Sequence, residues 1–138
     1  MYPEEIVIPM KEELTEHGFK ELLNADDVEN VLAEKGTTLV MINSVCGCSA
    51  GTARPGVLLA VHNSSKKPDN ITTSFAGFDV EAVNQVRKHL LPYPPSSPAI
   101  ALFKDGELVH MIERHMIEGR SAQMIADNLL GAFDTHCN

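Results

Sequence analysis

The stretch from Thr37 to Asn43 constrains the fold of this chain most, because it is an almost continuous run of apolar and β-branched residues. Such a run is typical of a central strand that is buried on both faces. A helix-compatible stretch from about Ser49 to His62 follows, with Pro55 inside it or near its first turn, where proline would bend it. A buried strand that leads into a helix favours an α/β fold with parallel strands.

Downstream of this helix, the pattern predicts a second strand, a second helix, a β-hairpin and a last helix. The dipeptide Asp105-Gly106 is a strong hairpin signal, because both residues tolerate the backbone of a tight turn. The expected segments are a strand over 71–76, a helix with Asp79 as N-cap that is ended by Pro92, strands over 99–103 and 107–112, and a helix from Ser121.

The N-terminal third is predicted to be helical. One helix opens at Pro9, or a longer helix is kinked there, and it ends at Gly18. Asn24 with Asp27 favours the start of a second helix, which ends at Gly36.

From residue 37 onward the predicted order of elements is β-α-β-α-β-β-α. The first two strands should be parallel, because a helix joins them, and the hairpin supplies antiparallel partners. We therefore expect a mixed four-stranded sheet with helices on both faces. Residues 1–138 would form one α/β domain, with N-terminal helices over 1–36 and the core over 37–138.

Cys46 and Cys48 lie at the junction between the central strand and the next helix. Unsatisfied backbone N–H groups and the positive end of the helix dipole converge there, and a cysteine pKa can fall from about 8.5 to about 3.5–7.5. The first cysteine of such a pair usually projects outward while the first helical turn covers the second. Cys46 is therefore the expected nucleophile and Cys48 the resolving thiol. Gly47 allows the bend that a labile bridge between them requires.

Two other interpretations of the cysteines stay open. Free cysteines often serve as small buried apolar side chains. A structural zinc site needs four ligands, and beyond the pair the chain offers only Cys137 and six histidines without paired spacing. We expect Cys137 to be a frayed surface thiol, with a third redox partner as its functional alternative.

The composition argues against several classes of protein. A net charge of −8 argues against nucleic acids and anionic membranes as partners. No apolar run approaches the ~18 residues of a membrane span, and the N-terminus is acidic where a signal peptide would be basic. We therefore expect a cytoplasmic protein. Its sequence is compatible with a monomer and with a homodimer.

The order of elements, the cysteine pair and Ser97-Pro98 directly before the third strand together resemble the thioredoxin fold. Over essentially the full chain, several spaced motifs are more specifically similar to the bacilliredoxin family. These motifs are Asn43-Ser44-Val45-Cys46-Gly47-Cys48, Ala53-Arg54-Pro55, Phe75-Ala76-Gly77, Pro95-Ser96-Ser97-Pro98 and Arg114-His115-Met116-Ile117-Glu118-Gly119.

The resemblance implies thiol–disulfide exchange, in particular the removal of bacillithiol from mixed disulfides on proteins, with some disulfide isomerase activity. It implies thiolated client proteins and a low-molecular-weight thiol as partners, bacillithiol as co-substrate, and neither an organic cofactor nor a metal. Pro98 would be cis and shape the substrate groove, and Ser97 would offer backbone hydrogen bonds to a substrate chain. The alternative is a non-enzymatic redox sensor or adaptor with the same fold.

Three basic residues are candidates for binding the carboxylates of bacillithiol and for stabilising the thiolate. Arg54 lies in the helix after the cysteines. Arg114 and His115 follow a strand whose end should lie on the same edge of the sheet as Cys46. Each of the three alone is also compatible with a solvated or capping role.

Overall fold

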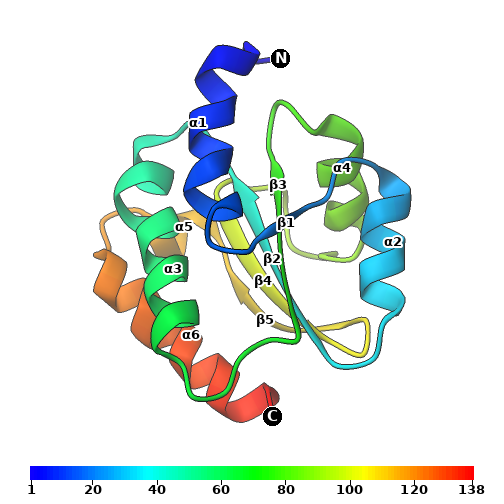
Figure 1. Ribbon diagram of the computed structural model, residues 1–138, viewed down its shortest axis with the longest axis vertical. Coiled ribbons are helices and arrows are strands. Elements are labelled where there is room, and N and C mark those ends of the chain that lie inside the picture. Colours follow the sequence, from blue (N-terminus) through cyan, green and yellow to red (C-terminus); the bar gives the residue numbers. More distant parts are fainter.

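The computed structural model describes residues 1–138, and its centre is a five-stranded mixed sheet (Figure 1). From one edge to the other, the strands are β1 (Lys20–Glu21), β3 (Asn70–Phe75), β2 (Thr37–Asn43), β4 (Ala99–Lys104) and β5 (Glu107–Ile112). β1, β3 and β2 are parallel to one another, whereas β4 is antiparallel to both of its neighbours, β2 and β5. The helices are α1 (Glu4–Thr15), α2 (Ala25–Ala33), the π-helix η1 (Ser49–Ala53), α3 (Arg54–Asn63), α4 (Val80–Lys88), α5 (Arg114–Ile117) and α6 (Ala122–His136).

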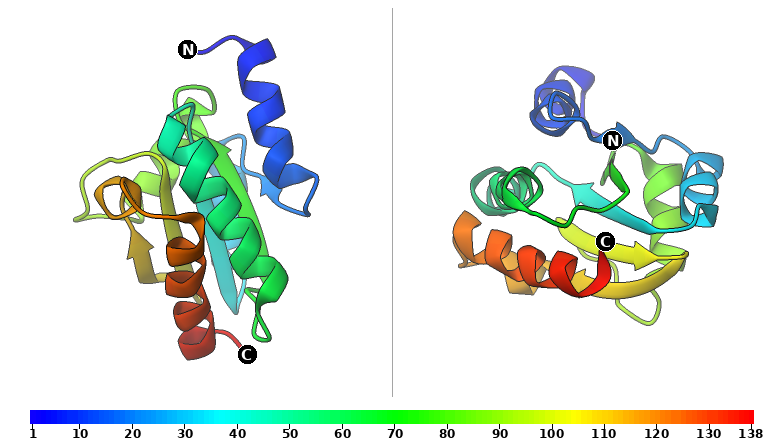
Figure 2. Two further views of the ribbon diagram at one scale, coloured as in Figure 1. Left: turned by 90° about the vertical axis from the view of Figure 1, so that its left-hand side faces the viewer. Right: turned by 60° about the horizontal axis from the view of Figure 1, so that its bottom comes forward.

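Helices cover both faces of the sheet, and β2 is buried along its whole length, as predicted (Figure 2). Alternate side chains of a strand point to opposite faces. Leu39 and Met41 accordingly pack into the apolar cluster under α3 and α6, while Val40 and Ile42 pack into the cluster with α2 and α4. None of the helices has both the length and the apolar character that crossing a membrane requires.

The sheet has five strands, so the prediction of four is wrong. The additional strand, β1, consists of two charged residues and is too short to show an alternating pattern. Its position is determined by its neighbours, because Phe19 and Leu22 are buried in different clusters. The Leu22 N–H also donates to the Thr73 carbonyl (2.8 Å). The first 36 residues are therefore not only helical but also contribute to the sheet.

α1 contains Pro9, so the longer of the two alternatives for this helix is observed and a start at Pro9 is wrong. The helix begins directly after Pro3, which is its N-cap residue and has an extended backbone (φ −64°, ψ 145°). Glu4 and Glu5 in the first turn interact favourably with the positive end of the helix dipole.

The other predicted elements are present, with small shifts of their ends. Asn24 caps α2 by accepting from the Asp27 N–H (2.9 Å), as predicted. Asp105 (φ 51°) and Gly106 (φ 82°) form the hairpin turn. Asp79 is the N-cap residue of α4, as predicted, but its carboxylate accepts from the Phe75 N–H (2.9 Å) and makes no hydrogen bond to the first turn of the helix.

Candidate active site

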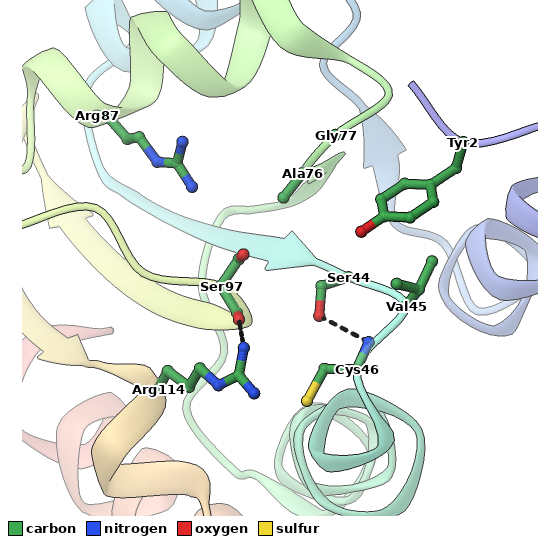
Figure 3. Close-up of a pocket in the computed structure, with 9 residues that line it drawn as sticks. All are labelled: Tyr2, Ser44, Val45, Cys46, Ala76, Gly77, Arg87, Ser97 and Arg114. Atoms are coloured by element: carbon green, nitrogen blue, oxygen red, sulfur yellow. Dashed lines mark hydrogen bonds between the residues drawn. The ribbon is translucent and has the colours of Figure 1, made fainter.

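A cavity of about 430 Å³ lies beyond the carboxyl ends of β2 and β3 (Figure 3). This edge of an α/β sheet is where binding sites usually form, and the volume lies in the range of small-molecule sites. The residues that line the cavity are Tyr2, Ser44, Val45, Cys46, Ala76, Gly77, Arg87, Ser97 and Arg114.

The loop that carries the cysteines is fixed by Asn43, the last residue of β2. Its Oδ1 accepts hydrogen bonds from the Ser44 N–H (2.8 Å), the Ser49 hydroxyl (2.9 Å) and the Arg54 guanidinium (3.0 Å). Its Nδ2 donates to the Met10 carbonyl in α1 (3.1 Å). Asn43 therefore connects the end of the strand, the start of the helix and α1, and so determines where the following residues lie.

Cys46 and Cys48 are free thiols in different surroundings. Cys46 lines the cavity, whereas Cys48 packs against the apolar cluster under α3 and α6. The Cys46 N–H donates to the Ser44 hydroxyl (3.2 Å), and the Cys48 N–H donates to the Cys46 sulfur (3.3 Å). Gly47 between them is exposed. Both cysteines are partly buried, but the first faces the cavity and the second packs against the apolar core.

The two thiols also differ in acidity. Hydrogen bonding from the Cys48 thiol lowers the pKa of Cys46 most, and the Cys48 N–H and the charge of Arg114 lower it further. Burial acts in the opposite direction and raises this pKa, but the net shift is downward. Burial raises the pKa of Cys48, and the neighbouring Cys46 raises it further. Cys46 is therefore the sulfur that ionises first.

The helix after the cysteines covers residues 49–63, but its first turn is a π-turn. The Arg54 N–H donates to the Ser49 carbonyl, five residues back. Pro55 has no N–H and cannot donate to the Gly51 carbonyl as an α-helical residue would, which accounts for the wider turn. The bend expected near Pro55 thus takes the form of a π-turn next to the cysteines.

The Ser97–Pro98 peptide bond is cis, as the resemblance implies. Ser97 lines the cavity, and Pro98 is buried behind it. The loop before β4 therefore presents Ser97 to the cavity, beside Cys46.

Arg114, the first residue of α5, extends into the cavity. Its Nη1 donates to the Ser97 carbonyl (3.3 Å; Figure 3). Its Nε donates to Glu118. His115 does not line the cavity, and its side chain is 74% exposed. Of the two predicted basic residues after β5, the structure thus places Arg114 next to Cys46 and His115 outside.

Arg54 does not reach the cavity, so the expectation that it binds a substrate carboxylate is wrong. The residue is only 1% exposed. Its Nη1 donates to Asn43 Oδ1 and to the Ser44 carbonyl (both 3.0 Å), and its Nε donates to Glu13 (3.2 Å). The guanidinium faces inward beneath the cysteine loop, where it supports the backbone.

Cys137 is a core residue, so the expectation of a frayed surface thiol is wrong. It is 4% exposed and belongs to the apolar cluster under α3 and α6. Burial raises the pKa of its thiol, which disfavours a redox role. Among histidine, cysteine, aspartate and glutamate side chains, no group of three lies close enough to hold a metal ion.

Arg87 and Tyr2 line the cavity but are not predicted as site residues from the sequence. A signal for Arg87 is present, because it lies four residues after Val83 and three before Leu90 and so occupies the apolar face of α4. Tyr2 has no such signal. Its ring packs against Gly77, where a Cβ would come within 2.6 Å of the ring.

Comparisons with known proteins agree with this geometry. A family model described as disulphide isomerase matches residues 2–137. A bacilliredoxin of Cytophaga hutchinsonii is 58% identical over 134 residues, which are 97% of this chain and 98% of that protein. A bacilliredoxin of Bacillus licheniformis is 48% identical over 137 residues, which are 99% of this chain and 95% of that protein.

Solved thioredoxins share the fold. A mutant thioredoxin of Halobacterium salinarum superimposes with a TM-score of 0.60 at 14% identity, covering 86% of this chain and 90% of that one. Mitochondrial thioredoxin 3 of Saccharomyces cerevisiae gives a TM-score of 0.57 at 14% identity, with coverages of 86% and 96%. With its thioredoxin fold and its Cys-Gly-Cys motif, this chain belongs to the bacilliredoxin family, and its role lies in thiol–disulfide redox chemistry.

Proposed function

We propose that this protein is an oxidoreductase that removes bacillithiol, or a similar low-molecular-weight thiol, from mixed disulfides on client proteins. The observation that carries this proposal is the contrast between two neighbouring sulfurs. Cys46 faces the cavity with a lowered pKa, and Cys48 lies against the core with a raised pKa. Because the thiolate is the attacking form, this contrast supports Cys46 as the nucleophile.

In the first step, the Cys46 thiolate attacks the sulfur of the small thiol within the mixed disulfide. A disulfide between Cys46 and the small thiol forms, and the client sulfur leaves as a thiolate, which takes a proton from solvent. Cys48 then loses its proton and attacks the Cys46 sulfur. The internal disulfide forms, and the small thiol leaves. In the alternative second step, the thiolate of another small thiol attacks the sulfur of the small thiol that is bound to Cys46. This step releases a small-molecule disulfide and regenerates the Cys46 thiolate.

The first step also prepares Cys48 for the second. Burial raises the pKa of Cys48 most. The hydrogen bond to Cys46 and the negative charge of the Cys46 thiolate raise it further. Both effects disappear when Cys46 is held in a neutral disulfide, so Cys48 becomes more acidic only after the first step. The internal disulfide formed in this way needs an external thiol reductant to complete the cycle.

Catalytic turnover distinguishes this function from the alternative of a redox sensor. The protein should release bacillithiol from a large molar excess of a bacillithiolated client in the presence of a thiol reductant. Mass spectrometry should detect an adduct on Cys46 that converts to a Cys46–Cys48 bridge. A reaction that stops after one equivalent per protein, with reductant still present, would support a sensor and contradict the proposal.

Replacing Arg114 by methionine should move the pH dependence of Cys46 reactivity to higher pH. The pKa of Cys46 is lowered chiefly by hydrogen bonding from Cys48 and further by Arg114, so removing either cause raises it. Reactivity rises as pH passes through this pKa and levels off above it, so a higher pKa moves the rise upward. Cys48→Ala should therefore shift the curve further than Arg114→Met.

The rate of Cys46 alkylation by iodoacetamide, followed by mass spectrometry across pH, measures both shifts. Arg120→Met is the matched control, because Arg120 is an exposed arginine that does not line the cavity. If the pH curve of Cys46 alkylation for Arg114→Met coincides with the wild-type curve, Arg114 does not contribute to the lowered pKa of Cys46.

A further inference from the structure

Arg87 projects from α4 into the cavity without an acidic partner. It takes part in none of the ion pairs of the protein, and its Nε is buried without a hydrogen-bond acceptor. Buried polar groups in native proteins almost always have a partner, and charged groups are rarely buried unless paired. Arg114, the other arginine of the cavity, has Glu118 as its partner. The half-buried guanidinium of Arg87 therefore has no anion paired with it within the protein, and its terminal nitrogens are open to an anion in the cavity.

The charge of the cavity is opposite to that of the protein. The chain carries 19 acidic residues and a net charge of −8, but no acidic residue lines the cavity. Figure 3 shows Arg114 beside Cys46, whereas the guanidinium of Arg87 extends from α4 and lies farther from Cys46. A ligand with an anionic group at one end and a sulfur at the other matches this distribution.

We propose that Arg87 binds a carboxylate of the small thiol whose sulfur is exchanged at Cys46. The proposal rests on the function proposed above and assigns the residue that would recognise the carboxylate end of the small thiol. A guanidinium presents two parallel N–H groups that match the two oxygens of a carboxylate. The terminal nitrogens of the guanidinium, which face the cavity, would pair with the carboxylate, and a volume of about 430 Å³ accommodates a small molecule between Arg87 and Cys46.

Selectivity follows from the partly buried, unpaired state of Arg87. A thiol without a carboxylate leaves the guanidinium unpaired, and a site built for a polar group discriminates against analogues that lack it. Burial lowers the pKa of Arg87, which is the unfavourable effect that a bound anion would offset. The preference for a carboxylate-bearing thiol should therefore depend on this residue and not on the reactivity of Cys46.

The test compares one client protein in two thiolated forms. One form carries bacillithiol, and the other carries the methyl glycoside of cysteinyl-glucosamine, which has the same thiol and sugar but lacks the malate carboxylates. The wild-type protein should have a higher kcat/KM for the first form by about 10–100-fold, the factor expected for a hydrogen-bonded charged group. Arg87→Met should abolish this preference, and Arg87→Lys, which keeps the charge, should retain part of it.

Two controls isolate the role of Arg87. Lys88→Met removes an exposed charge from the same helix and should keep the wild-type preference. Alkylation of Cys46 by iodoacetamide should be unchanged in Arg87→Met, because Arg87 is not among the causes of the lowered pKa of Cys46. Thermal unfolding shows whether Arg87→Met is folded, and Arg87→Lys gives the same comparison with a smaller change.

The outcomes separate this proposal from the proposed function. Equal kcat/KM values for the two forms with the wild-type protein would overturn the carboxylate site while leaving the removal of small thiols intact. An equal loss for both forms in Arg87→Met, with the preference retained, would overturn it in favour of a contact between Arg87 and the client. No turnover of either form by the wild-type protein would contradict the proposed function itself.

Discussion

Cys46→Ser is expected to abolish the release of small thiols from client proteins, whereas Cys137→Ser should retain wild-type activity. A serine hydroxyl does not ionise near neutral pH, so the variant has no nucleophile at the position that faces the cavity. Cys137 is buried in the apolar cluster, away from the residues that line the cavity. The measurement is the rate of client reduction at substoichiometric protein, normalised to the folded fraction of each variant.

Cys48→Ser separates the two steps of the mechanism. The first exchange should still occur, so the small thiol should accumulate on Cys46 and be released only by a second small thiol. Mass spectrometry of the intact variant after one turnover identifies this adduct. Full activity of Cys46→Ser, or an adduct on another cysteine, would show that the nucleophile is assigned wrongly.

The features of the site that the sequence predicts are those encoded by a short local pattern. The cysteine pair follows a buried strand directly, so its place at the carboxyl edge of the sheet follows from the strand alone. Ser97 and Pro98 precede β4 in the same way, and the hairpin turn brings Arg114 back to the same edge. In each case the position in the chain determines the position in space.

The direction of long side chains could not be predicted in this way. The π-turn before α3 has one residue more than an α-turn, and one residue corresponds to a rotation of about 100° around a helix axis. Arg54 follows this turn directly, and its side chain points into the protein. Arg87 lies on an apolar helix face but reaches the cavity, because a long side chain can bury its stem and extend its charged end elsewhere.

The two-residue strand β1 shows a second limit. Its sequence, Lys20-Glu21, has no strand character, and it joins the sheet because buried neighbours on either side fix the segment. Pairing with β3 is thus a consequence of tertiary packing, which no local pattern of two residues contains.

Arg54→Met should destabilise the folded protein by about 2–4 kcal/mol, because the variant loses two buried charge-assisted hydrogen bonds. Methionine fills the space of the stem but cannot donate to Asn43 Oδ1 or to the Ser44 carbonyl. The bond to Glu13 contributes less, because that carboxylate is about half exposed. Urea unfolding should show a lower midpoint with an unchanged m-value.

The exposed Arg120 provides the control, since Arg120→Met removes an equal charge and should change stability by no more than about 0.5 kcal/mol. Asn43→Ala removes the acceptor of one of these hydrogen bonds. The losses of stability in Asn43→Ala and in Arg54→Met should therefore sum to more than the loss in the double variant, because both single variants lose the same bond. Strict additivity would mean that the two residues act independently. A fully stable Arg54→Met that instead loses the preference for carboxylate-bearing thiols would return Arg54 to the substrate site, because a supporting residue acts on folding and a ligand residue on affinity.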